Sequence, residues 1–250
     1  MIALNHITSG PGLPNWRLVL LALAAILVAP VTYGDEGEVV ERIDFTDKPS
    51  GNAIPWLQEN GFEFKLNARG LNPYFRDDAL VLESESQRAG LIYRDMDLTG
   101  VNRVRITWGV ERFPEGADWD NGVYRVPIAV MFSFGDEPVN SGSLIMPDAP
   151  YFIGLFLGKN EQEDHAYTAR YYKEGGRYFC KPCNIEVGKT VTTVFDFDDI
   201  LQEEFGVSPS LPVTRFGFQM NTLDTAGGAR AFLKSVEFLA PASTASYQQE

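Results

Sequence analysis

The chain is poor in cysteine and in basic residues, and after its first 35 residues it has no long apolar run. Two Cys in 250 residues exclude a disulfide-rich miniature scaffold and an array of zinc ribbons. No later apolar run reaches the roughly 18 residues of a membrane span, so we expect no internal span. Against 34 Asp and Glu there are only 21 Lys and Arg, giving a net charge of −13. This sign is wrong for a surface that neutralises phosphates, which argues against nucleic-acid binding.

The common catalytic signatures are missing as well. The chain has no GxSxG, no P-loop, no GxGxxG after a predicted strand and no HExxH. A pair of carboxylates for glycoside hydrolysis needs only to be close in space. A hydrolase therefore stays open as an alternative, without a pair that the sequence singles out.

The amino-terminal segment has the pattern of a secretory signal peptide. Arg17 precedes the unbroken apolar run 18–28, which Pro30 ends before the acidic start at Asp35. The run is short for a spanning helix of about 20 residues. We predict that residues 1–34 are removed and that the protein is exported to the periplasm or beyond the cell. An uncleaved N-terminal helix that tethers the protein is the alternative.

Period-two alternation predicts β-strands along the rest of the chain. Val104, Ile106, Trp108 and Val110 alternate with polar or small residues, which indicates a half-buried strand. The apolar run 126–134 indicates a central strand. Further strands are predicted at 42–45, 62–66, 79–83, 91–96, 151–157, 167–172, 190–195, 213–220 and 231–239.

One short helix is expected after Asp196 or Asp198, ending at Gly206. About a dozen strands with one helix predict an all-β fold, a two-sheet antiparallel β-sandwich of the jelly-roll kind. Neither a repeat nor a low-complexity linker divides the chain. We therefore predict a single domain over residues 38–239, followed by a disordered tail over residues 240–250.

Three stretches together resemble a family of secreted bacterial proteins grouped as domain of unknown function 3047. The stretches comprise residues 90–108, 110–134 and 195–238, the last including Asp224 and the Gly227-Gly228 pair. The resemblance covers most of residues 85–239. It implies export and a β-fold, and it implies no activity.

A looser resemblance concerns galactose-binding-like jelly rolls, a class of carbohydrate-binding modules. The acidic and aromatic strand at 43–45, Trp56 and the closing strand at 234–238 carry it. It implies a carbohydrate ligand. Lys234 and Ser235 stand where an acidic pair is common in such modules, which weakens the case for calcium, the one cofactor that the resemblance suggests.

Cys180-Lys-Pro-Cys183 is the sharpest local motif. A CxxC pair serves as a redox centre, as half of a zinc site or as a structural disulfide. A redox role needs the first Cys at a helix N-terminus, yet the flanking residues look like strands. Zinc would need two more ligands. In an oxidising compartment we expect a disulfide between Cys180 and Cys183.

Two polar groups are candidates for ligand binding. The first is the loop Asp118, Trp119, Asp120 and Asn121. Its carboxylates would accept hydrogen bonds from sugar hydroxyl groups while the indole stacks on a pyranose ring. The alternative is a solvated turn with Trp119 folded back on the sandwich. Asp120 and Asn121 also suit calcium, but they supply too few ligands for it; no metal site is predicted.

The second group comprises Gln219, Asn221 and Asp224. By parity, Gln219 and Asn221 share a strand face with Gly217, opposite Phe216 and Phe218. They could line a concave sheet face. An exposed polar face of an antiparallel sheet would look the same.

A catalytic alternative rests on His165, Arg170 and Tyr171, whose surroundings loosely resemble the tyrosine-bearing strand of jelly-roll alginate lyases. There a Tyr and a His move a proton and an Arg neutralises the uronate carboxylate. By parity His165, Tyr167 and Tyr171 would share one face, with Arg170 opposite. The plain alternative is aromatic packing on a sheet surface.

The leading hypothesis is an exported, non-catalytic β-sandwich protein that binds a carbohydrate or another component of the cell envelope. A polysaccharide lyase or hydrolase is the second hypothesis. The third is a structural or assembly partner in the envelope that has no small-molecule site.

Overall fold

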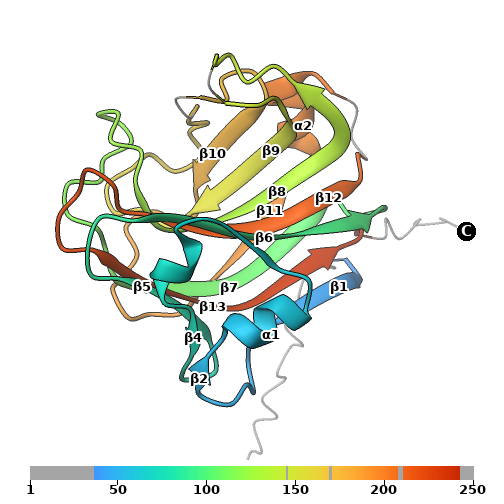
Figure 1. Cartoon of the computed structure of the whole chain (residues 1–250). Coiled ribbons are helices and arrows are strands. Elements are labelled where there is room, and N and C mark those ends of the chain that lie inside the picture. Colours follow the sequence, from blue (N-terminus) through green and yellow to red (C-terminus); the bar gives the residue numbers. More distant parts are fainter. Residues whose placement is uncertain (1–36, 145, 169–170, 208–210, 243–250) are drawn as a thin grey trace, which may run out of the picture. The chain divides into compact units, whose positions relative to one another are not determined.

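Two β-sheets form the architecture (Figure 1). The computed structural model describes residues 37–144, 146–168, 171–207 and 211–242. In the seven-stranded sheet the order is β11 (Val191–Asp196), β7 (Arg103–Arg112), β13 (Ala229–Leu239), β5 (Leu80–Ser84), β4 (Tyr74–Phe75) and β2 (Gly51–Asn52). The strand β1 (Val39–Asp44) also pairs with β13.

The six-stranded sheet carries the candidate site. Its order is β10 (Gly176–Cys180), β9 (Ala149–Phe156), β8 (Val126–Val139), β12 (Val213–Asn221), β6 (Ala89–Leu98) and β3 (Glu63–Leu66). Neighbouring strands in both sheets pair antiparallel, except that β10 runs parallel to β9. The predicted all-β, two-sheet sandwich is therefore confirmed.

The core between the sheets follows from the alternation in the sequence. Along β7 the side chains of Val104, Ile106, Trp108 and Val110 are fully buried. The Trp108 indole donates a hydrogen bond to the Thr193 hydroxyl at 3.0 Å, which satisfies its one polar atom inside the core. From β8 and β12 come Phe132, Phe134, Phe216 and Phe218, all part of the same core. Their outward neighbours are thereby set on the opposite face of the six-stranded sheet.

The helices lie outside this pattern. The predicted helix is α2 (Asp198–Phe205), and Gly206 ends it in the left-handed conformation at φ 65°. A second helix, α1 (Ile54–Glu59), begins with a proline in its first turn and buries Leu57. A short 3-10 helix (Ala68–Leu71) follows β3. Neither of these two was predicted from the sequence.

The strand predicted over 167–172 is not seen at residues 167, 168, 171 and 172, the part of this segment that the structure describes. Tyr167 makes an isolated antiparallel bridge to Tyr178, and Tyr171 lies in a turn. Because an isolated bridge does not continue into an extended strand, the predicted parity of His165, Tyr167 and Tyr171 has no basis.

The ends of the chain lie largely outside the described residues. The predicted signal peptide over 1–34 does so entirely, as do residues 243–250 of the predicted tail. Where the tail is described, the Ala240 amide donates a hydrogen bond to the Glu38 carbonyl at 2.9 Å. Within the described ranges, every helix is too short or too polar to cross a membrane.

Candidate functional site

A second aromatic cluster covers the outer face of the six-stranded sheet. It contains Trp119, Phe152, Phe156, Tyr167 and Tyr178. On β8, Ala129 of this cluster and Met131, which packs against it, alternate with Ile128 and Val130, which belong to the core between the sheets. The cluster therefore packs on the side of the sheet that faces away from the core, where it builds one wall of a cavity.

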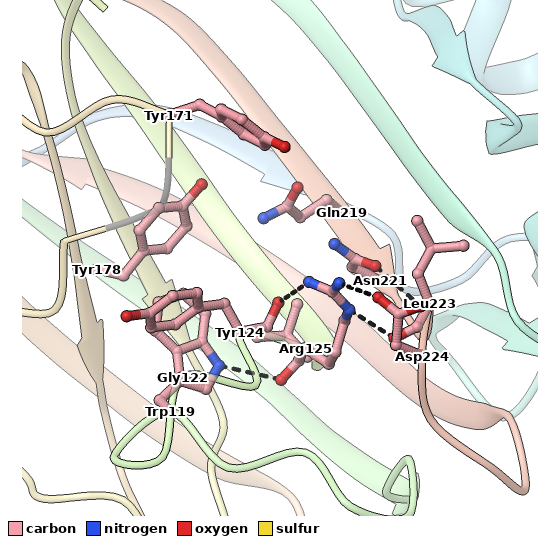
Figure 2. Close-up of a pocket in the computed structure, with 11 residues that line it drawn as sticks. Trp119, Gly122, Tyr124, Arg125, Tyr171, Tyr178, Gln219, Asn221, Leu223 and Asp224 are labelled. Atoms are coloured by element: carbon pink, nitrogen blue, oxygen red, sulfur yellow. Dashed lines mark hydrogen bonds and ion pairs between the residues drawn. The ribbon is translucent and has the colours of Figure 1, made fainter. Parts of the chain in front are cut away.

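The cavity has a volume of about 440 Å³, at the lower end of the range for small-molecule sites. Figure 2 shows its residues, with tyrosines on one side, amide side chains in the middle and an ion pair on the other side. The lining residues are Trp119, Gly122, Tyr124, Arg125, Val126, Tyr171, Tyr178, Gln219, Asn221, Leu223 and Asp224.

The amide residues come from β12, in the arrangement that parity predicted. Phe216, Phe218 and Met220 are fully buried in the core, so Gln219 and Asn221 project to the outer face and line the cavity. The Asn221 side-chain oxygen accepts a hydrogen bond from the Leu223 amide at 3.2 Å. Its side-chain NH2 group is drawn toward the cavity (Figure 2). A primary amide supplies both a donor and an acceptor, which is what a sugar hydroxyl requires.

Tyr178 and Tyr171 form the aromatic side. Tyr178 is only 7% exposed, and its burial raises the pKa of the phenol, while a hydrogen bond with the Gln219 side chain acts in the opposite direction. Gly154 on β9 makes room for the Tyr178 ring, because a Cβ at that position would overlap with it. Tyr171 is 40% exposed and lines the cavity at its surface. A phenol hydroxyl can both donate and accept a hydrogen bond.

Arg125 and Asp224 form the opposite side. One terminal nitrogen of Arg125 lies 2.6 Å from an Asp224 carboxylate oxygen. Its Nε donates to the Leu223 carbonyl at 2.5 Å, and its other terminal nitrogen donates to the Tyr124 carbonyl at 2.8 Å. These bonds tie the loop before β8 to the loop after β12. Arg125 thus fixes the shape of the cavity.

Trp119 does not present its indole to solvent. It is 4% exposed and stacks on Phe156, with ring centroids 4.6 Å apart and planes inclined by 18°. Its indole nitrogen donates to the Arg125 carbonyl at 3.0 Å. The buried indole corresponds to the alternative in which Trp119 folds back on the sandwich, and its stacking on a pyranose stays a prediction. Trp119 supports the cavity from within the cluster.

The other members of its loop do not line this cavity. The Asp118 carboxylate accepts hydrogen bonds from the Asn121 amide at 3.0 Å and from its side chain at 2.8 Å, and these bonds lower the pKa of Asp118. Asp120 accepts a hydrogen bond from the Tyr167 hydroxyl at 2.6 Å. Burial, together with this bond to Asp120, raises the pKa of Tyr167 to about 12. Asp118, Asp120 and Asn121 thus form a turn that is stabilised by hydrogen bonds within the turn and by one from Tyr167.

The two described residues of the lyase alternative, His165 and Tyr171, do not both line the cavity. Tyr171 lines it, whereas the His165 ring packs edge-on against Tyr167 with centroids 4.5 Å apart and is not among the described residues that line it. Arg170 lies outside the described residues. The cavity therefore offers no described His beside Tyr171 for proton transfer.

Cys180 and Cys183 form the expected disulfide, with the sulfur atoms 2.06 Å apart. Cys180 ends β10 and is fully buried in the aromatic cluster. Over the described ranges, no three or more His, Cys, Asp or Glu side chains gather to hold a metal ion. Calcium accordingly remains a suggestion of the sequence alone.

Comparison with known proteins adds no family. No protein-family model matches the chain, and neither does a curated protein sequence. The predicted membership of the domain of unknown function 3047 family is therefore not confirmed.

Several solved carbohydrate-binding proteins are distantly similar. Winged bean acidic lectin complexed with methyl-α-D-galactose shares 10% identity at a TM-score of 0.40, over 80% of this chain and 98% of that one. A mutant of a family 29 carbohydrate-binding module shares 12% identity at a TM-score of 0.33, over 79% of this chain and 91% of that one. The exoplasmic/lumenal domain of VIP36, in its Ca2+/Man3GlcNAc-bound form, shares 10% identity at a TM-score of 0.37, over 76% of this chain and 90% of that one. At such TM-scores we draw no conclusion about function from the likeness.

Proposed function

We propose that this chain is an exported, non-catalytic β-sandwich protein that binds a saccharide in the cavity on the outer face of its six-stranded sheet. The observation that carries the proposal is the pairing of an aromatic side with two primary amides. Tyr171 and Tyr178 stand beside Gln219 and Asn221 around one cavity of about 440 Å³.

This combination suits a saccharide for physical reasons. Sugar rings have apolar C–H faces that pack on aromatic rings, and hydroxyl groups that both donate and accept hydrogen bonds. The amides of Gln219 and Asn221 offer both functions, and so do the tyrosine hydroxyls. A partly open cavity with few charges favours weak, reversible capture, as expected of a binding module.

Export is the part of the proposal that rests on the sequence. The segment 1–34 has the order of a signal peptide, with a basic residue, an apolar run and a small or polar exit. The disulfide between Cys180 and Cys183 fits a compartment in which disulfides persist. Both features support a location outside the cytoplasm, in the periplasm or the medium.

A glycan array tests the binding. The full chain is expressed, and the form that the cell produces is purified and applied to the array. We expect at least one class of saccharide to bind, and the Gln219→Ala variant to lose most of that binding. Gln58→Ala is the matched control, because Gln58 is an exposed amide on α1 outside the cavity.

An array without any binding would contradict the proposal and favour a structural or assembly role in the envelope. Equal losses in Gln219→Ala and Gln58→Ala would contradict the location of the site. Binding that is retained in Gln219→Ala would do the same.

A further inference from the structure

The charged groups of the cavity cancel each other. Among the described residues that line it, Arg125 is the one cation and Asp224 the one anion, and they form an ion pair at 2.6 Å. The other polar lining groups are amides and phenols, which are neutral at ordinary pH. The cavity therefore presents hydrogen-bonding groups without a net charge.

Three of the five N–H donors of the Arg125 guanidinium are already engaged within the protein. Each of its three guanidinium nitrogens already makes a bond, to the Asp224 carboxylate, the Leu223 carbonyl and the Tyr124 carbonyl. A carboxylate on a ligand would need the paired donors of a guanidinium fork. The fork formed by Nε and one terminal nitrogen of Arg125 is already occupied by the Leu223 carbonyl and the Asp224 carboxylate, so a ligand carboxylate could use it only by displacing them.

Asp224 also repels such a ligand. Its side chain is 76% exposed at the cavity, so an incoming carboxylate would meet it directly. The whole chain carries −13, which adds a weaker repulsion of the same sign. Like charges brought together at a binding site are a common means of rejecting wrong ligands.

We infer that Asp224 acts as a specificity-determining residue: by neutralising Arg125 it makes the cavity accept neutral saccharides and reject uronic acids. This inference rests on the proposed function, and it deepens that function by naming the class of saccharide. It also predicts a gain of function, because removing the Asp224 charge leaves the Arg125 charge unopposed.

Asp224→Asn is the variant that tests the inference. The two side chains have the same shape, so the amide oxygen can still accept from Arg125. Asp224 has a φ of 57°, a conformation that Asn tolerates as well as Asp does. We therefore expect the variant to fold.

The probes are matched pairs of oligosaccharides from pectin, alginate and hyaluronan, each uronic acid form beside its carboxyl-reduced, neutral form. For the best-bound pair, we expect the wild type to bind the neutral form with about tenfold or higher affinity than the acidic form. The reason is that the carboxylate of the acidic form would find no unpaired positive charge in the cavity. In Asp224→Asn the affinity for the acidic form should rise about fivefold, and the gain should fall as salt is raised.

Asp97→Asn serves as the control, because Asp97 is an exposed residue of β6 outside the cavity and its replacement changes the net charge equally. Its acidic-form affinity should stay at the wild-type value. An equal gain in Asp97→Asn would show that net charge, rather than the Arg125 pair, governs selection, and would overturn the inference.

Two other results would overturn it. One is wild-type binding of acidic and neutral forms with equal affinity, which leaves the saccharide-binding proposal standing. The second is an Asp224→Asn variant whose preference for neutral forms is unchanged. If neither form of any pair binds and the wider glycan array is also blank, the proposed function itself fails, and the inference fails with it.

Discussion

At the scale of single residues, the Tyr167 hydroxyl shows how the cavity is held in shape from beneath. It donates to Asp120 at 2.6 Å and accepts a hydrogen bond from the Gln162 amide at 2.9 Å. The ring lies edge-on to Trp119, at 5.6 Å between centroids. One phenol thus connects the Asp118 to Asn121 turn with the aromatic cluster.

This phenol predicts a loss of stability at high pH. The pKa of Tyr167 is about 12 in the folded protein, above the ordinary value of 10. Stability from the neutral phenol is therefore complete below pH 10 and is lost as the pH rises from 10 toward 12. Tyr178, whose pKa is also raised, acts with the same sign.

Tyr167→Phe should flatten part of this alkaline loss and lower the free energy of unfolding at pH 8 by about 1–3 kcal/mol. Urea unfolding between pH 8 and 11.5 measures both effects. Tyr151→Phe is the control, because the Tyr151 ring packs on Phe205 and against the core between the sheets. A slope for Tyr167→Phe equal to that of the wild type would show that Tyr167 titrates normally.

The burial of Trp119 predicts that its replacement lowers the stability of the fold. Because its ring is buried against Phe156, Tyr124 and Tyr178, Trp119→Ala should cost about 3–5 kcal/mol of unfolding free energy. Thermal or urea unfolding measures this. Trp119→Ala protein with native stability and selective loss of saccharide binding would contradict the position of the indole inside the cluster.

At the scale of elements, alternation predicted strands well where one face is buried in the core. β7 and β12 follow their sequence patterns, and the outward position of Gln219 and Asn221 followed from the same parity. The strand prediction for 167–172 was not met, because Tyr167 and Tyr172 pack in the outer aromatic cluster. Such packing requires apolar side chains but no extended backbone.

The rest of the site depends on contacts that local patterns do not encode. Arg125 and Asp224 lie 99 residues apart in the chain and meet only because the loop before β8 and the loop after β12 lie at the same end of these two paired strands. Tyr178 lies on β10, where Phe179 enters the core and Tyr178 and Cys180 enter the outer cluster. Burial on both faces hides the alternation that would have marked this strand.

The turn after β10 carries its own prediction. Cys180 and Cys183 are joined, so denatured but unreduced protein should show no reactive thiols. Replacing both by Ala should lower the unfolding free energy by about 2 kcal/mol, the loop-entropy value for a short ring. Titration with a thiol reagent checks the first point, and two reactive thiols would refute the disulfide.

At the scale of the whole molecule, the signal peptide predicted over residues 1–34 has a consequence that expression in cells can test. Expressed in a bacterial host, the protein should be recovered outside the cytoplasm with an amino terminus near Asp35. Mass spectrometry of the intact chain measures this. Leu21→Arg, which places a charge in the apolar run, should block processing.

Recovery of wild-type chain that still begins at Met1 and stays with the membrane would contradict cleavage. That result would favour the tethered alternative. It would leave the saccharide site untouched, because the cavity is built entirely from residues after the predicted cleavage point.

The most direct test of the central claim is a nuclear magnetic resonance titration of isotope-labelled protein with the saccharide that binds best on the array. We expect the side-chain amide signals of Gln219 and Asn221 to shift, together with backbone signals of Tyr171, Tyr178 and Asp224. Shifts confined to other surfaces, such as the turn from Asp118 to Asn121, or the absence of any shift at saturating saccharide, would contradict it.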